Sequence, residues 1–321
     1  MHVVTIAIFA LVAMITEAFW NPSHATEPAD AFLVAEQPGQ LVISLNGQEI
    51  AEYVYVDPSV LRPFFANVRT RVGTPVTRPH PPRTGLDATD HASMHPGIWM
   101  AWGDISGEDF WRNRGRIVHE EFLEPPTSSP GMLHFATRSG LMTAEGARLA
   151  TCDNFLQLRA RPFGWAVDWT AVFTTVGGPI VFGDQEEMGF AARMATPLTE
   201  EAGGRITSAS GLASAAQTWG KPSLWCDTTG TVEGHVVGIT LIPSSANFRE
   251  SWWHNRAYGV FVANPFGRAA MQQGEPSRVI VTASEPLTLR FTAVIHEGNA
   301  YDIAQEVAAA RRTEKPAGRG R

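Results

Sequence analysis

Two histidines stand close together in a polar and aromatic stretch that runs from Asp90 to Trp111. His91 and His95 are four positions apart, a spacing that puts both side chains on roughly one side of a strand or a helical turn. Imidazoles change charge near neutral pH, so the pair is a candidate for general acid and base catalysis. Three alternatives stay open: hydrogen bonds to a sugar or a carboxylate, metal binding together with Asp90, and a structural role in the turn at Pro96.

The same region supplies aromatic and acidic binding candidates. Trp99 and Trp111 offer flat rings that can pack against the C–H face of a sugar, and Asp104 lies in an acidic loop between them. The alternatives are core tryptophans and an aspartate that only closes a turn. Farther on, a strand would place His119 and Glu121 on one face as a candidate acid–base couple, or on a solvated edge.

A second acidic group lies between Gly183 and Gly189 and contains Asp184, Glu186 and Glu187. Neighbouring carboxylates raise one another's pKa and can divide acid and base roles, so this group is the expected catalytic partner of the histidines. A solvated acidic turn is the alternative. Arg193 follows closely, and its guanidinium can clamp an acidic group with two parallel hydrogen bonds.

A third group begins at Trp253, a further candidate aromatic wall. His254 and Arg256 share a face if this segment is a strand, which suits recognition of hydroxyl or carboxylate groups. A salt bridge to one of the acidic turns explains the same residues equally well. Asn264 opens a polar turn and is the last substrate-binding candidate.

Short runs rich in Val, Ile, Thr, Phe and Trp recur along the chain, bounded by Gly, Pro, Asn or Asp. This pattern predicts strands, and the absence of βαβ alternation argues against a parallel sheet. One segment, Tyr301 to about Arg312, predicts a helix that Asn299 can cap. We therefore expect an all-β fold, a large antiparallel β-sandwich with a short C-terminal helix. The predicted strands are Gln40–Leu45, Glu52–Val56, Leu133–Thr137, Ala166–Thr175, Val236–Ile242, Gly259–Ala263, Arg278–Thr282 and Leu287–Ile295.

The composition is that of a globular protein with a substantial core. The 321 residues are 44% hydrophobic and carry a formal net charge of −7, so a nucleic-acid partner is not expected. No dinucleotide fingerprint, phosphate loop, nucleophile elbow or zinc-binding helix is present, and neither a cofactor nor a metal is expected. Cys152 and Cys226 either pair in an oxidising compartment or stay two separate buried thiols.

The apolar run Val3 to Ile15 resembles an export signal, and the small residues Ser23 and Ala25 suit a cleavage site. We expect a signal peptide at 1–25, one β-sandwich domain at 26–314, a disordered tail at 315–321, and a secreted or periplasmic protein. An uncleaved membrane anchor or a buried first strand is the alternative. No later segment reaches the length of a spanning helix, so no membrane partner is expected after signal removal.

Several segments together resemble the bacterial proteins catalogued as methane oxygenase PmoA or PmoA-like, over about residues 40 to 297. The histidine block departs from the usual DHPHHRGIW-like form, because Ala92-Ser93-Met94 replace one histidine and a basic residue. The membrane subunit of that name is integral to the membrane, so we interpret the name as a misnomer here. The segments are Arg62-Pro63-Phe64-Phe65, Asp90-His91, His95-Pro96-Gly97-Ile98-Trp99, Gly103 to Trp111, Phe182 to Glu186, Trp219-Gly220, Trp225-Cys226-Asp227, Arg256 to Gly259 and Asn264 to Gly267.

A looser similarity joins Arg62 to Phe65, Thr77-Arg78 and the histidine-rich turn before Trp99 to the galactose-mutarotase-like supersandwich. In that fold histidines and a carboxylate on a concave sheet act on sugar rings. The resemblance implies a secreted carbohydrate-active enzyme, an epimerase, lyase or hydrolase, with a small-molecule or polysaccharide ligand. A non-catalytic glycan-binding module and, from the PmoA name, a metal-dependent oxygenase are the alternatives. The oligomeric state is left open.

Overall fold

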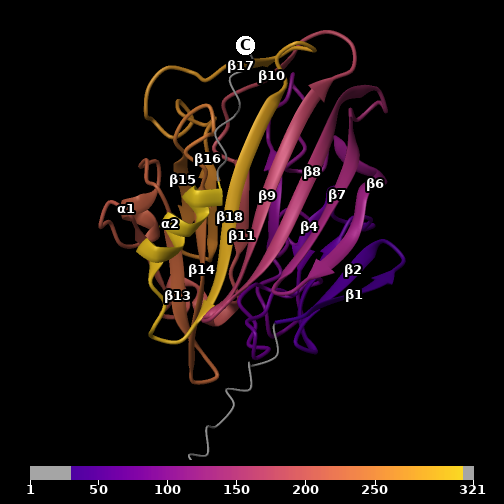
Figure 1. Cartoon of the computed structure of the whole chain (residues 1–321). Coiled ribbons are helices and arrows are strands. Elements are labelled where there is room, and N and C mark those ends of the chain that lie inside the picture. Colours follow the sequence, from indigo (N-terminus) through magenta and orange to yellow (C-terminus); the bar gives the residue numbers. More distant parts are fainter. Residues whose placement is uncertain (1–29, 314–321) are drawn as a thin grey trace, which may run out of the picture.

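The computed structural model describes residues 30–313, in which two large sheets lie face to face (Figure 1). The predicted signal peptide at 1–25 and the predicted tail at 315–321 lie outside the described residues. Both ends of the predicted domain at 26–314 also fall outside them, so the single-domain assignment stays a prediction. Within 30–313, no helix has the length and apolar character needed to cross a membrane.

The first large sheet contains eight antiparallel strands, and its spatial order leaves the chain order after the fifth. This jump brings together segments that are far apart in the sequence. In spatial order the strands are β1 (Phe32–Gln37), β2 (Gln40–Leu45), β3 (Gln48–Val54), β4 (Phe64–Ala66), β5 (Ile98–Trp102), β11 (Met188–Arg193), β16 (Val260–Asn264) and β15 (Trp252–Arg256).

The second large sheet is also antiparallel and contains eight strands. A separate two-stranded ribbon and four short helical segments complete the described chain. In spatial order the second sheet is β12 (Arg205–Ser208), β13 (Cys226–Val232), β14 (His235–Pro243), β18 (Leu287–Glu297), β9 (Gly164–Thr175), β8 (Arg148–Arg161), β7 (Met132–Met142) and β6 (Arg116–Ser129). The ribbon is β10 (Ile180–Phe182) with β17 (Val279–Val281), and the helical segments are η1 (Thr196–Leu198), η2 (Glu200–Ala202), α1 (Ala215–Thr218) and α2 (Ile303–Thr313).

The core lies between the two sheets, where alternate residues of each strand point inward. Trp169 of β9 packs its ring against Tyr53 and Phe65 of the first sheet, with ring centroids 6.2 and 5.6 Å apart. Burial of each such aromatic side chain stabilises the fold by about 1.5–3 kcal/mol. In the middle of the first sheet, β5, β11 and β16 are buried on both faces, so a second layer of side chains must cover their outer face.

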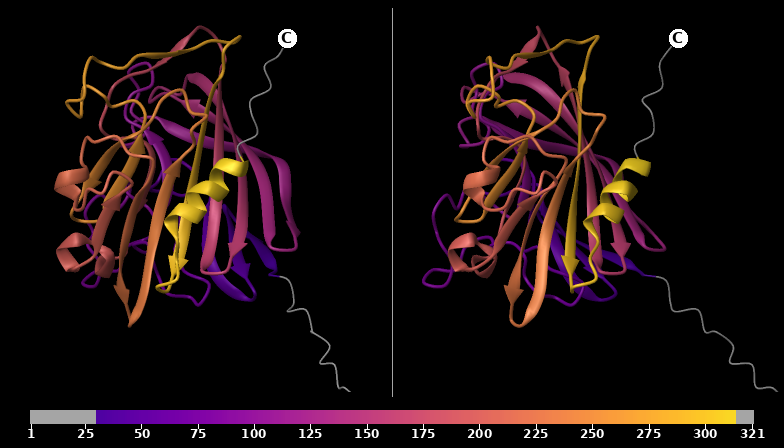
Figure 2. Two further views of the ribbon diagram at one scale, coloured as in Figure 1. Left: turned by 60° about the vertical axis from the view of Figure 1, so that its left-hand side comes forward. Right: turned by 90° about the vertical axis from the view of Figure 1, so that its left-hand side faces the viewer.

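Helix α2 lies across the outer face of the second sheet (Figure 2). Its apolar side, with Val307 and Ala310, packs against Ile242 and Val294, and its buried Glu306 pairs with Arg161. The helix therefore covers part of the outer face of the second sheet.

The fold-class prediction is confirmed: the protein is a large antiparallel β-sandwich with a short C-terminal helix. The predicted strand Gln40–Leu45 coincides with β2, and the helix predicted for Tyr301 to Arg312 is α2. Both cysteines are free and buried, which resolves the open alternative in favour of separate thiols. Burial raises the pKa of the Cys152 thiol, so this group stays protonated and packs as a small apolar side chain.

Candidate functional site

The three polar groups of the sequence meet on the outer face of the first sheet. The register pairs Trp99 with Ala191, Ala191 with Val262, and Val262 with His254, so these residues form one row across β5, β11, β16 and β15. Cross-strand partners share a face of the sheet, and this face points away from the second sheet. We call the polar side chains gathered over this row the outer-face site.

His95 is almost fully buried in the outer-face site, with 1% of its surface exposed. Its ring stacks on Trp99 with centroids 5.6 Å apart, and its Nε2 accepts a hydrogen bond from Trp111 Nε1 at 3.2 Å. Because indole N–H is only a donor, Nε2 must be unprotonated and the proton must sit on Nδ1. Among the described residues nothing accepts a hydrogen bond from this buried Nδ1.

The charge of His95 is fixed by its surroundings. Burial, followed by the positive charges of His91, Arg193, Arg62 and Arg78, lowers the pKa of His95 to about 2. The imidazole is therefore neutral at physiological pH, and it can donate a hydrogen bond from Nδ1 but cannot supply a proton as an imidazolium.

His91 lies at the surface and is held by a short chain of charged groups. Its Nδ1 lies 2.8 Å from Asp90 Oδ2, and its side chain is 42% exposed. Arg193 donates to both oxygens of Asp90, at 3.0 and 2.8 Å, and is itself almost fully buried. Arg78 donates to the backbone carbonyls of Asp90 and His95 at 2.7 and 2.8 Å. The two arginines thus fix the turn that carries both histidines.

The protonation of this chain of groups follows from its geometry. Burial alone raises the pKa of Asp90, but the hydrogen bonds from His91 and Arg193 outweigh it and lower the pKa to about 2. Asp90 is therefore ionised and accepts from His91 Nδ1–H, so Nε2 is the ring nitrogen of His91 that Asp90 does not bind. His91 also has a φ of 51°, a left-handed conformation that non-glycine residues adopt at a cost.

Tyr258 connects the two halves of the outer-face site. Its ring is nearly parallel to those of His91 and His95, at centroid distances of 6.1 and 6.4 Å, and the Arg193 guanidinium lies 4.6 Å from its centroid. Burial raises the pKa of Tyr258, and the charges of Asp90 on one side and of Glu186 and Arg256 on the other also act on it. The tyrosine is therefore a protonated donor within electrostatic reach of both halves.

The second half of the site is built around Glu186. Arg256 Nη2 lies 3.1 and 3.0 Å from its two carboxylate oxygens, and His254 Nδ1 lies 3.3 Å from Oε2. The contact with His254, followed by the charge of Arg256, lowers the pKa of Glu186 to about 2. Burial lowers the pKa of His254, so the group at neutral pH is a carboxylate between a neutral imidazole and a guanidinium.

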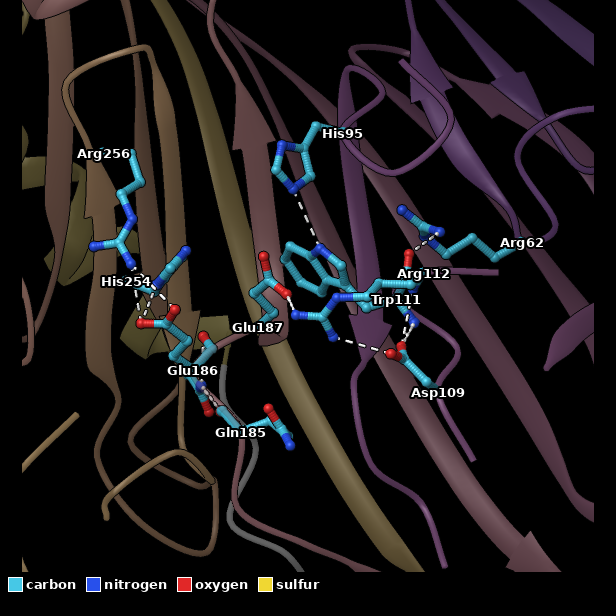
Figure 3. A network of polar contacts seen from close by, with 11 residues as sticks. Arg62, His95, Asp109, Trp111, Arg112, Gln185, Glu186, Glu187, His254 and Arg256 are labelled. Atoms are coloured by element: carbon cyan, nitrogen blue, oxygen red, sulfur yellow. Dashed lines mark hydrogen bonds and ion pairs between the residues drawn. The ribbon is translucent and has the colours of Figure 1, made fainter. Parts of the chain in front are cut away.

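Glu186 and Glu187 are adjacent in the chain but turn to opposite sides (Figure 3). Glu186 faces His254 and Arg256, whereas Glu187 pairs with Arg112, which also binds Asp109 at 2.9 Å. The acidic segment therefore connects the loop that follows β5 to the strand β15. This connection is why the three groups of the sequence form one site.

The expectation of three tryptophan walls is wrong for Trp99, Trp111 and Trp253. Each ring is fully buried, so in this structure none can offer a face to a sugar. Trp99 and Trp111 instead cover the outer face of β5, and Trp253 packs in the core between the sheets. The half-exposed aromatic groups at the site are Tyr258 and Trp219, the latter 5.7 Å from the Arg256 guanidinium.

Three other expected site residues fix the conformation of loops: Asp184, Asp104 and Asn264. Asp184 accepts hydrogen bonds from the backbone amides of Ala269, Ala270 and Ser277, at 3.0, 2.8 and 2.6 Å. Asp104 accepts from the Gly107 amide at 2.9 Å and closes its turn. Both carboxylates are therefore occupied by backbone amides instead of facing a substrate.

Asn264 also acts on the backbone, because its side-chain amide donates to the carbonyls of Gln185 and Glu186. It is a positioning residue for the acidic segment, since it fixes the direction from which Glu186 approaches Arg256. The predicted bidentate clamp of Arg193 does form, but its acidic partner is Asp90 of the same chain and not a substrate.

His119 lies apart from the site, on β6 of the second sheet, with its ring 4.5 Å from that of Tyr55. The pairing register shifts between His119 and Glu121, so the simple alternation that would place them together as an acid–base couple is broken. Glu121 pairs with Arg138 instead.

The sequence patterns did not identify Asp90 as the acidic partner of Arg193. They also did not single out Tyr258, Arg112 and Trp219 as residues of the site. The position of Asp90 directly before His91 is a signal for a carboxylate–histidine pair, but nothing local marks Arg193 as its partner. In residues 30–313 no group of three or more His, Cys, Asp or Glu side chains could hold a metal ion.

The fold and site define an all-β sandwich with a cluster of histidines, carboxylates and arginines on one outer face. Residues 40–311 match the model of a family of unknown function (DUF6807), and the chain belongs to this family. Among solved structures, a galactose mutarotase-like protein from Lactobacillus casei ATCC 334 is similar over 83% of this chain and 100% of its own, with 11% sequence identity and a TM-score of 0.35. The search of curated proteins gave no match. Neither the family match nor the structural one carries the PmoA name.

Proposed function

We propose that this protein is a carbohydrate-active enzyme in which His91 is the general acid–base group. The observation that carries the proposal is the fixed Arg193–Asp90–His91 chain, which ends in an exposed imidazole beside Tyr258. A carboxylate bound to one imidazole nitrogen fixes the tautomer and stabilises the imidazolium that forms when the other nitrogen takes a proton.

Each remaining group has a role that matches its protonation state. Neutral His95 is buried and positions the site through ring contacts with Trp99 and His91, and protonated Tyr258 supplies a hydroxyl donor. Glu186 is ionised and accepts from substrate hydroxyls, and Arg256 donates to substrate oxygens on the same side. With Glu186 held as a carboxylate, His91 is the group whose proton transfer to or from a sugar hydroxyl or the neighbouring carbon drives the reaction.

The outer-face site suits a saccharide because planar polar side chains alternate there with partly exposed aromatic rings. Tyr258 and Trp219 offer ring faces to the C–H side of a pyranose, and Arg256 and Glu186 offer paired donors and acceptors to its hydroxyls. The charges of the cluster are largely paired within the protein, which favours a neutral, hydroxyl-rich ligand over an ion.

A glycan-binding module without catalysis is the second candidate. The low pKa values of His95 and Glu186 favour it, because neither group changes its charge near neutral pH and only His91 is left for proton transfer. The third alternative is a metal-dependent oxygenase. The described residues do not bring together three side chains that could hold a metal ion, so we assign no step to a metal. Export through residues 1–25 to a secreted or periplasmic location is also part of the proposal and rests on the sequence alone.

The test compares the full chain with His91→Gln on a panel of mono- and oligosaccharides, with products followed by mass spectrometry and NMR. We expect turnover of at least one sugar, a kcat lowered about 100-fold or more in the variant, and a KM that changes little. His235→Gln, which removes an exposed histidine at the start of β14, is the matched control and should keep full activity.

Two outcomes contradict the proposal that the protein is a carbohydrate-active enzyme. Sugar binding by calorimetry without any product supports the glycan-binding module. A stoichiometric transition metal in the purified protein, with activity lost on chelation, supports the oxygenase.

A further inference from the structure

A cavity of about 390 Å³ lies on the outer face of the second sheet, on the opposite side of the sandwich from the outer-face site. Figure 1 shows α2 over β14 and beside β18, and on the other side of β18 no helix of the described residues covers β9, β8 and β7. Ala310 of α2 bounds the cavity on one side, and its volume is within the range of small-molecule sites. We call it the α2 cavity, and its polar and aromatic lining includes His134, Phe155, Gln157, Asp168, Thr170 and Arg290.

The strand register explains why these side chains converge. Arg290 pairs with Thr170, and Thr170 pairs with Phe155, so the three lie side by side on β18, β9 and β8 and share one face. Because neighbouring strands are about 4.8 Å apart, Arg290 and Phe155 stand about 10 Å apart at the backbone. The next row on the same face contains His134 and Gln157, which are also paired. The floor of the α2 cavity is thus wide enough for one or two sugar rings.

The lining has unused hydrogen-bonding capacity. Among residues 30–313, no side-chain hydrogen bond or ion pair reaches the guanidinium of Arg290 or the imidazole of His134. The Gln157 amide nitrogen contacts the sulfur of Met132 at 2.7 Å, which leaves its carbonyl oxygen free. Asp168, by contrast, is satisfied by Arg159 and by Thr292 at 2.6 Å. The cavity therefore presents a free cation, a free amide oxygen and an imidazole at one place.

Phe155 adds an apolar surface to this polar floor. Its side chain is 42% exposed, although Phe is among the residues most often buried. An exposed ring between a guanidinium and an amide offers a face for the C–H side of a pyranose and partners for its hydroxyls. A small inorganic anion would use Arg290 but would leave the ring without a function, and it would lie near the carboxylates of Glu124 and Asp168.

We propose that the α2 cavity is a second saccharide-binding site, which takes a neutral mono- or disaccharide. The sugar ring lies on Phe155, and its hydroxyls bind Arg290, Thr170 and the free oxygen of Gln157. This site has no residue in common with the outer-face site, so it does not depend on whether His91 is catalytic.

The experiment is a titration of the full chain with galactose, cellobiose and xylobiose, followed by calorimetry and saturation-transfer NMR. We expect at least one sugar to bind with a millimolar Kd, and Phe155→Ala and Arg290→Met each to weaken binding about tenfold or more. Phe248→Ala removes another exposed phenylalanine, outside the α2 cavity, and should bind as the wild type does. His91→Gln should also keep this binding, which separates the second site from the outer-face site.

A sugar that binds equally well to both cavity variants, or the absence of binding by all three sugars, would overturn the proposal. Binding of phosphate or citrate that Arg290→Met abolishes, without sugar binding, would identify an anion site instead. Thermal unfolding of each variant accompanies the titration, and if Phe155→Ala does not fold, Arg290→Met and a crystal soaked with the bound sugar decide the question.

Discussion

Arg193 and Asp90 are 103 positions apart in the chain, yet both guanidinium amino groups of Arg193 bind the two carboxylate oxygens of Asp90 at 3.0 and 2.8 Å. The pairing of β11 with β5 makes this possible, because it brings the end of β11 beside the turn that precedes β5. Since Asp90 in turn binds His91, a buried residue of the sheet determines the orientation of an exposed histidine.

Replacement of Arg193 tests this relationship. Arg193→Lys keeps the positive charge but loses the bidentate geometry, so we expect His91-dependent activity to fall and the free energy of unfolding to drop by about 1–3 kcal/mol. The expected loss in the free energy of unfolding is modest because Asp90 is 39% exposed and its charge is partly screened. Urea unfolding and kinetics together check it, with Arg205→Lys as a control on an exposed arginine. Unchanged activity would show that the clamp does not orient His91.

Acid should weaken the fold through Glu186. In the unfolded chain this carboxyl has its ordinary pKa of 4.5, whereas the folded state holds it at about 2. The resulting stabilisation is complete above pH 4.5 and disappears as the pH falls to about 2. Because the side chain is 32% exposed, we expect about 1–2 kcal/mol, which Glu186→Gln should remove. Urea unfolding at pH values across this window measures it, and Glu145→Gln, at an exposed position, should behave as the wild type.

His95 should remain in one neutral tautomer, with the proton on Nδ1, throughout the range of about pH 5 to 8. The reasons are the hydrogen bond from Trp111 to Nε2 and the pKa of about 2. Nitrogen NMR of the full chain reports both ring nitrogens directly. Trp111→Phe removes the donor and should cost about 1–2 kcal/mol of stability while releasing the tautomer. A His95 signal that titrates near pH 6 would contradict this assignment.

Gly97 allows the histidine turn to approach the sheet. A Cβ at this position would lie 2.1 Å from the backbone carbonyl oxygen of Phe65, far inside any real contact. We expect Gly97→Ala to destabilise the protein by about 2–4 kcal/mol, because the clash can be relieved only by shifting β5 from β4. Gly177→Ala, with nothing within 4 Å of the added carbon, is the matched control. Thermal unfolding of both variants gives the comparison, and equal midpoints would contradict the packing argument.

Local patterns were sufficient for the fold class and for several elements. The residues that favour strands over Gln40–Leu45 and Leu287–Ile295 predict strands, and the structure places β2 and β18 there. The helix at the C-terminal end follows from residues that favour helices over one continuous segment. These are short-range properties that do not depend on the strand order.

The composition of the site was also visible in the sequence, but the roles of its members were not. His91, His95, Glu186, Glu187, Arg193, His254 and Arg256 are the predicted polar residues that meet on one face. Asp184 and Asp104 have the same chemistry as Glu186, and only the position of neighbouring backbone amides makes them loop anchors. Burial of a tryptophan likewise depends on what packs over it.

The sequence by itself determined that this protein is an antiparallel β-sandwich with three polar and aromatic groups, because periodicity and residue type act over a few neighbouring positions. The tertiary structure decided that β5, β11, β16 and β15 lie side by side, that Arg193 holds Asp90 and that Trp99, Trp111 and Trp253 are buried. Strand order and pKa depend on contacts between residues far apart in the chain. Such contacts have no local pattern, since any strand edge and any buried charge can in principle meet several partners.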